Sequence, residues 1–227
     1  MLTRSDKLRI TRLRSRLLEW HTGHYRSLPW RHPSASTFER ICVELLLQRT
    51  RAQTVAAIYP SFFSRFHSWE AIARSKIEEL EQAFKPLGLW QRRARSVKAL
   101  AIYAADNAGR FPSNVGELSK ITAVGQYVAN AILLFQHGLA RPLLDVNMAR
   151  VLERYLRPRR LADIRHDPWL QQAAHWLVRG NDPIKVNWAT IDLAHAYCRP
   201  ANPLCASCPV KPWCNTGKRK ADVPTVV

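Results

Sequence analysis

Long apolar runs and acidic residues are scarce in this 227-residue sequence. No stretch approaches the roughly 18 to 20 consecutive apolar residues of a membrane-spanning helix. The opening segment, MLTRSDKLRITRLRSR, carries charge throughout and contains no apolar segment of the kind found in secretory signals. We therefore expect no membrane association, and the protein is predicted to be cytoplasmic.

The scarcity of acidic residues leaves a large positive charge. There are 17 Asp and Glu against 35 Lys and Arg, which gives a formal net charge of +18 spread along the chain. Solubility or attraction to a membrane surface would also suit a basic protein, but an excess of this size on a folded chain favours a polyanion. Nucleic acid is the expected partner.

Alternating strand patterns and repeats of solenoid period are also absent, and nearly every periodic segment is typical of a helix. Four glycines, Gly88, Gly109, Gly138 and Gly180, fall where helices should end. The predicted helices are 6–25, 36–50, 51–66, 68–75, 76–84, 91–109, 115–120, 126–138, 147–156, 168–180 and 187–198. We predict an all-α fold with two lobes.

Cysteine is nearly confined to one short segment, CRPANPLCASCPVKPWC. The spacing is C-x6-C-x2-C-x5-C, formed by Cys198, Cys205, Cys208 and Cys214. Disulfides are improbable in a reducing cytoplasm, which leaves a metal site. Structural zinc usually uses two C-x2-C pairs, whereas an iron–sulfur cluster tolerates wider and unequal spacings, so both metals stay open at this point. The remaining cysteine, Cys42, lies in the apolar run ICVELLL and is expected to be buried packing.

The segment ITAVGQYVANAILLF places a short glycine-containing turn before a helix. Backbone N–H groups of Val124, Gly125 and Gln126 at such a turn can hold a phosphate without reading base sequence. An ordinary packing element of two helices and a turn is the alternative.

Two carboxylates stand in unusual surroundings. Glu44 interrupts ICVELLL, and burying it is costly unless it has a partner or a role, although the helix could turn it towards solvent. Asp145 directly precedes the helical stripe of VNMARVLERYL, which is typical of a helix N-cap.

The segment IDLAHAYC followed by the cysteine spacing resembles the [4Fe–4S] loop of the endonuclease III and MutY family of DNA glycosylases, and the resemblance extends over about residues 25–215. It implies a [4Fe–4S] cluster rather than zinc. It also implies a helical barrel with a helix-hairpin-helix over 27–145, a cluster domain formed by 1–26 and 146–227, and a cleft between them.

Within this resemblance, Asp145 matches the essential aspartate, which stabilises the cationic sugar and can orient water. Tyr127 stands where bifunctional members carry a nucleophilic lysine, and a phenol cannot form a Schiff base. A monofunctional enzyme with weak or absent lyase activity is therefore expected. The family's usual Pro-Gly pair in the hairpin is replaced by Thr122-Ala123, a departure that affects the turn and its hold on phosphate.

Glu44 resembles the acid that protonates or hydrogen-bonds the departing base in the MutY and thymine-mismatch branches, and a pocket holding Glu44 and Asp145 would push their pKa values apart. Gln48 and Arg49 match residues that fill the space left by an extruded nucleotide, a solvated helix end being the alternative. Basic side chains expected to face phosphates are Arg92, Arg93, Arg95, Lys211, Lys218 and Arg219.

Glu44, Tyr127 and Asp145 together look most like the Mig branch, which excises thymine or uracil opposite guanine. Adenine excision of the MutY kind ranks second, because that branch typically has serine in place of Tyr127 and a further C-terminal domain. A third alternative is a glycosylase for another modified base. From a different class, a non-catalytic zinc-stapled DNA-binding module is also considered. The expected partner is double-stranded DNA with a mismatched or damaged base, bound by a monomer at the nucleoid.

Overall fold

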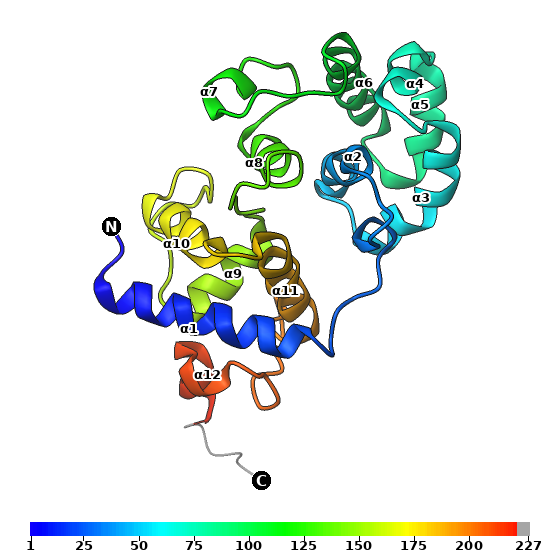
Figure 1. Ribbon diagram of the computed structural model, residues 1–227. Helices are drawn as coiled ribbons and strands as arrows, with labels where there is room; N and C mark the ends of the chain where they lie inside the picture. Colours follow the sequence, from blue (N-terminus) through cyan, green and yellow to red (C-terminus); the bar gives the residue numbers. More distant parts are fainter. Residues whose placement is uncertain (222–227) are drawn as a thin grey trace. The chain divides into compact units, whose positions relative to one another are not determined.

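The computed structural model describes residues 1–221, with side chains through residue 219. All regular structure within these residues is helical, which confirms the predicted all-α class (Figure 1). No helix in the described part of the chain is both long and apolar enough to cross a membrane. The chain divides into two compact units, one formed by Ser27–Gly138 and the other by Met1–Arg26 with the segment from Leu139 onward.

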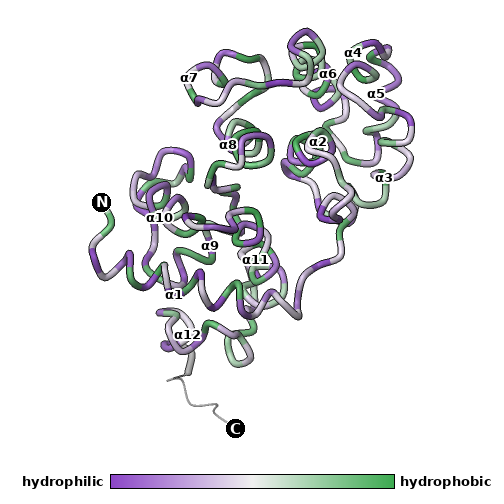
Figure 2. The backbone as a smooth tube through the Cα atoms, in the orientation of Figure 1, coloured by the Kyte–Doolittle hydropathy of each residue, from purple (hydrophilic) through white to green (hydrophobic). Residues whose placement is uncertain are grey.

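The discontinuous unit joins the N-terminal helix to the C-terminal third of the chain. Its elements are α1 (Arg4–His21), α9 (Val146–Tyr155), α10 (Pro168–Val178), α11 (Pro183–Ala196), η3 (Lys211–Trp213) and α12 (Asn215–Ala221). Helix α1 packs against α10 and α11, and α9 contacts α10, α11 and α12. Apolar and polar residues alternate along α1 (Figure 2), so one stripe, including Leu13 and Leu17, is buried in the core.

The continuous unit contains the remaining helices. They are η1 (Pro29–Arg31), α2 (Thr37–Leu47), α3 (Ala52–Arg65), α4 (Trp69–Arg74), α5 (Ile77–Phe84), η2 (Lys85–Leu87), α6 (Trp90–Asp106), α7 (Val115–Leu118) and α8 (Gln126–Phe135). Helix α2 contacts α3, α6 and α8, and its residues 41–46 are all buried. Cys42 is fully buried there, as predicted, and burial raises the pKa of its thiol well above the usual range.

Local signals in the sequence set several helix boundaries. Ser36 and Glu39 form the reciprocal bonds of a capping box at the start of α2. The four glycines expected at helix ends all have positive φ, for example 74° at Gly109 after α6 and 65° at Gly138 after α8. Helix α12, which follows the last cysteine, was not predicted.

Residues 139–145 pack with the discontinuous unit, whereas the sequence-based boundary placed them in the other lobe. Fully buried Asn187 holds this segment: its Oδ1 accepts from Leu143 N at 2.7 Å, and its Nδ2 donates to Arg141 O at 3.0 Å. A single buried amide on α11 thus ties down the chain that leads into Asp145.

Candidate functional site

Asp145 is the N-cap of α9, as the sequence predicted. Its Oδ1 accepts from the backbone N–H groups of Asn147 at 2.9 Å and Met148 at 2.8 Å, and its Oδ2 accepts from Asn147 Nδ2 at 2.6 Å. The two backbone bonds satisfy N–H groups that have no partner within the helix. Together the three bonds fix both carboxylate oxygens in orientation.

The pKa of the same carboxyl group is shifted from its ordinary value. Burial raises the pKa of Asp145, and this effect outweighs the bonds from Met148 and Asn147 and the positive charge of Arg150, which all favour the ionised form. A carboxylate that is fixed in position but costly to ionise interacts strongly with any positive charge that develops beside it.

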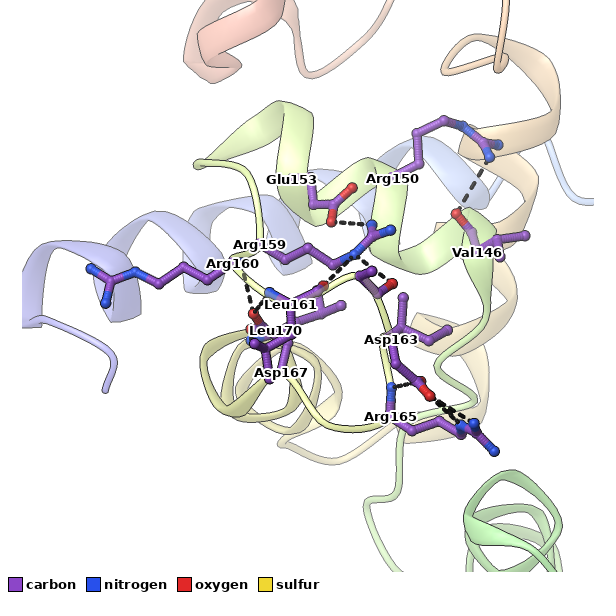
Figure 3. A network of polar contacts seen from close by, with 12 residues as sticks. Val146, Arg150, Glu153, Arg159, Arg160, Leu161, Asp163, Arg165, Asp167 and Leu170 are labelled. Carbon is purple, nitrogen blue, oxygen red and sulfur yellow. Dashed lines mark hydrogen bonds and ion pairs between the residues drawn. The ribbon is translucent and has the colours of Figure 1, made fainter.

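A chain of polar contacts continues from Asp145 along α9. Asn147 Oδ1 accepts from Arg150 Nη2 at 2.9 Å, and Arg150 Nε donates to the carbonyl oxygen of Cys198 at 2.6 Å. Arg150 also reaches Val146 O on the first turn of α9 at 3.4 Å (Figure 3). Sequence reasoning missed Asn147 and Arg150, although their positions two and five residues after a capping aspartate are a usable signal.

Glu44 and Tyr127 are brought together in the continuous unit. Glu44 is only 3% exposed on α2, and the phenol of Tyr127 on α8 donates to its Oε2 at 2.6 Å. Of the two alternatives for a carboxylate in such an apolar run, the structure shows burial with a partner, and the helix does not turn it towards solvent. Asp145 belongs to the other unit.

The segment 121–135, predicted as a turn that opens a helix, consists of a turn and α8, and α7 precedes it. Ile121 and Val124 are buried beneath the turn, while Gly125 is the N-cap of α8 and is exposed together with Gln126. Ala123 has a φ of 70°, which is the left-handed conformation that glycine adopts easily. The turn therefore has a glycine-type backbone without glycine at this residue.

Gln48 and Arg49 lie exposed just beyond the end of α2, and Arg49 has a φ of 58°. The prediction that Arg93 faces phosphates is wrong, because this side chain is only 7% exposed and its guanidinium points into the protein. Arg93 bonds five oxygen atoms around the end of α2 and the start of α6. Its neighbours Arg92 and Arg95 are exposed, as expected.

Four arginines of the discontinuous unit bind other groups of the protein itself. Arg159 pairs with Glu153 at 2.5 Å, and Arg165 pairs with Asp163 at 2.6 Å (Figure 3). Arg157 lies over the ring of Trp169. The fourth, Arg154, donates to the backbone carbonyls of Arg199 and Pro200 in the cysteine segment. Not all of the net positive charge is therefore available to a ligand.

All four clustered cysteines line one cavity. Its other walls include Val151, Tyr155, Leu193 and Val210, which are buried core residues. Burial raises the pKa of the Cys208 thiol to about 11, and the charges of the three other cysteines add to this. Thiols in such surroundings ionise readily only when a cation binds them.

Donors surround the same cavity. Arg154 Nη1 lies 3.6 Å from Cys198 Sγ and also bonds the carbonyl of Arg199, and the backbone N–H of Gly217 donates to Cys214 Sγ at 3.4 Å. Within the described residues, no group of three or more His, Cys, Asp or Glu side chains is placed to hold a metal ion. The four thiols nevertheless line one apolar cavity, with N–H donors beside two of the sulfurs, and they are the candidate ligands for a cofactor in this unit.

Comparison with known proteins decides the family. Residues 42–165, more than half of the chain, match the HhH-GPD superfamily of base excision DNA repair proteins. This chain belongs to the HhH-GPD superfamily. The match spans Glu44, the hairpin and Asp145, and it confirms the family resemblance seen in the sequence.

Individual HhH-GPD proteins extend the likeness over nearly the whole chain. A thymine-DNA glycosylase from Aeropyrum pernix is 34% identical over 214 residues, which cover 92% of this chain and 96% of that protein. The human adenine DNA glycosylase is 29% identical over 94% of this chain but only 41% of its own length. A solved thermostable thymine-DNA glycosylase superposes with a TM-score of 0.83 at 27% identity, covering 93% of this chain and 97% of that one.

Proposed function

We propose that this protein is a monofunctional DNA glycosylase that hydrolyses the N-glycosidic bond of thymine or uracil mispaired with guanine. The observation that carries the proposal is the carboxylate of Asp145, held by three N–H donors at the start of α9 in a member of the HhH-GPD superfamily. The high identity and mutual coverage with the Aeropyrum pernix thymine-DNA glycosylase support the choice of base.

Asp145 performs the electrostatic part of the reaction. When the base leaves with the bonding electrons, the sugar becomes an oxocarbenium-like cation, and a fixed carboxylate nearby stabilises that charge. Water then adds to the anomeric carbon, with Asp145 accepting its proton or orienting it. Because burial raises the pKa of Asp145, this ionised form is the costly one in the resting enzyme and is stabilised as the cation develops.

Glu44 and Tyr127 act on the departing base. The base carries away negative charge, and a buried carboxyl group with its phenol partner 2.6 Å away can supply a hydrogen bond or a proton to it. An apolar helix interior strengthens such a bond because water is excluded. In the proposed reaction Glu44 supplies the hydrogen bond or proton to the base, and Asp145 acts on the sugar as a carboxylate.

Tyr127 also limits the reaction to base release without strand cleavage. A lysine at this position would attack the sugar as an amine and lead to strand cleavage, but a phenol forms no Schiff base. Borohydride treatment during turnover is expected to trap no covalent complex with DNA. An efficient adduct would show that another amine acts as nucleophile.

The hairpin turn and the end of α2 bind the DNA. Gly125 and Gln126 are exposed residues at the N-terminus of α8, a position that suits a phosphate, and Val124 beside them is buried. Gln48 and Arg49 are exposed in the turn after α2 and fill the stack when a nucleotide is extruded. Double-stranded DNA is the partner, bound by a monomer at the nucleoid.

Cys198, Cys205, Cys208 and Cys214 would hold a [4Fe–4S] cluster, which would clamp the segment between α11 and α12. In this role the cluster supplies structure and no chemical step. Purified protein is expected to be brown, with iron and sulfide in equal amounts. Colourless protein containing zinc would favour the zinc-stapled alternative.

A panel of duplexes tests the reaction itself. Thymine or uracil opposite guanine, adenine opposite guanine or 8-oxoguanine, and oxidised pyrimidines are incubated with the protein and scored for abasic sites with and without alkali. Release of thymine and uracil opposite guanine, with breaks appearing only after alkali, is expected. Preferential release of adenine would replace the proposal with the adenine alternative, and no release from any duplex would favour a binding module.

A further inference from the structure

Arg93 is an interior arginine in a strongly basic protein. It begins the second turn of α6, yet it is 7% exposed, and burial lowers the pKa of its guanidinium. Charged side chains are seldom buried to this degree without extensive pairing. No carboxylate is among the groups that it bonds, because every acceptor is a carbonyl or a hydroxyl.

The acceptors belong to two turns. Arg93 Nε donates to Gly88 O at 2.8 Å, immediately before α6. Its Nη2 donates to Gln48 O at 2.6 Å and Thr50 Oγ1 at 2.5 Å, on either side of Arg49. Its Nη1 reaches Leu46 O at 3.0 Å and Leu45 O at 3.4 Å in the last turn of α2.

Each of these turns contains a non-glycine residue with left-handed backbone. Arg49 has a φ of 58° and Leu89, next to Gly88, has a φ of 49°. Both side chains are exposed, Leu89 to 57%. Left-handed conformations cost L-residues about 1–2 kcal/mol and persist only where the surroundings impose them. The guanidinium bonds carbonyls adjacent to both residues.

Only arginine fits this position. Its planar fork offers five N–H donors in fixed directions, and its charge suits the carbonyl end of α2. Lysine carries the same charge on a single rotating nitrogen, so it cannot bond Gly88, Gln48 and Leu46 together.

We propose that Arg93 is a positioning residue that presets the Gln48–Thr50 turn for entry into the base stack when a nucleotide is extruded. The inference rests on the proposed glycosylase function. Arg93 itself touches neither the base nor the sugar. It acts by holding Arg49 in a conformation that the free chain would rarely adopt, so that no ordering is needed at the moment of extrusion.

The test uses Arg93→Lys with Arg74→Lys and Arg110→Lys as matched controls, since all three keep the net charge and lie in the continuous unit but only Arg93 is buried. Single-turnover release of uracil is measured from two duplexes, one with guanine and one with an abasic analogue opposite the uracil. An unpaired uracil is cheaper to extrude, so it depends less on a residue that fills the stack.

Arg93→Lys is expected to slow release from the guanine duplex roughly 10- to 100-fold, and from the abasic-analogue duplex by less than about threefold. The two controls should match the wild type on both. Equal losses of Arg93→Lys on the two duplexes would assign it a general structural role and overturn the inference, as would behaviour identical to the controls. A wild type that releases no base would instead defeat the proposed function.

A milder variant covers the case in which Arg93→Lys fails to fold. Thr50→Val removes one acceptor and leaves Arg93 in place, and it should show the same preference for the unpaired uracil at a smaller size. Combining it with Arg49→Ala should give less than the product of the single losses, because both act through one turn. Losses that are equal on both duplexes, or fully independent of Arg49, would overturn the inference.

Discussion

Asp145 and Glu44 are held in opposite ways. Asp145 stands at a helix end, where backbone N–H groups one turn away fix its carboxylate. Glu44 lies in the middle of a buried helix, and Tyr127, which donates a hydrogen bond to it, is 83 positions away in the chain. The first arrangement needs only local sequence. The second exists only when α2 and α8 pack together, so it is the more easily lost by mutation.

Helix α2 also shows that a hydrogen bond from tyrosine to glutamate does not by itself indicate a catalytic glutamate. Glu39, also on α2, accepts a hydrogen bond from Tyr59 at 2.7 Å, nearly the distance of the Glu44–Tyr127 pair. Glu39, however, also closes the capping box with Ser36 and is only partly buried. The Glu39–Tyr59 pair therefore provides an internal control for the Glu44–Tyr127 pair.

Asp145→Asn should have the largest effect. We expect single-turnover base release to fall roughly 10³-fold or more, because the charge that stabilises the sugar cation is lost. An amide still caps α9, so binding to a mismatched duplex should be retained. Quantifying abasic sites together with duplex affinity checks this, and a folded, binding variant with unchanged release would contradict the assigned role.

The same substitution should stabilise the fold at neutral pH. Since burial raises the pKa of Asp145, ionising it costs folding free energy at every pH above its unfolded pKa of about 3.9. Asparagine removes that cost, so the melting temperature at pH 7 should rise relative to the wild type. Below the unfolded pKa both side chains are neutral, and the difference should disappear there.

Glu44→Gln should come next, with release lowered roughly 10²-fold through loss of the acid. Tyr127→Phe removes one donor to Glu44 and should cost about 1–3 kcal/mol of unfolding free energy. The double variant should lose less than the sum of the two in activity, because both act through one hydrogen bond.

Glu39→Gln and Tyr59→Phe are the matched controls for this pair. They should lower stability through the capping box and the Glu39–Tyr59 bond but leave the release rate of folded protein unchanged. If these controls slow base release as much as Glu44→Gln does, the contrast between the two pairs on α2 is wrong.

Asn147→Ala should change the pH dependence more than the maximum rate. Asn147 Nδ2 favours ionised Asp145, so its removal raises the pKa of that carboxyl further. Activity requires the ionised form, so the acid limb of the pH–rate profile should move to higher pH. Asn107→Ala, at an exposed position beyond α6, should leave the profile where it is.

Ala123→Gly should have the smallest effect. Its left-handed φ of 70° costs alanine about 1–2 kcal/mol, and glycine relieves this strain. The greater freedom of glycine in the unfolded chain offsets about half of the stabilisation. Unfolding free energy from urea titration should rise by up to about 1 kcal/mol. Ala105→Gly, inside α6, should lower it by about the same amount. A fall at Ala123 would show that its Cβ contacts outweigh the strain.

Much of the site could be predicted because its signals are local. The capping position of Asp145, the capping box at Ser36 and the glycine helix ends depend on neighbours within one helical turn. Burial of Glu44 followed from its apolar flanks, although its pairing with Tyr127 did not. Arg93 was misjudged for the opposite reason: arginine is normally exposed, and nothing near it in the sequence indicates that carbonyls of α2 lie within reach.

The amino-acid sequence alone determined the helical class, the helix ends, the cysteine spacing and the capping aspartate, because each depends on periodicity or on bonds between near neighbours. Only the tertiary structure decided that Tyr127 meets Glu44, that Arg93 joins two turns, and that four thiols surround one cavity. These contacts join residues far apart in the chain, and they form only when packing of the helix faces brings their backbones together.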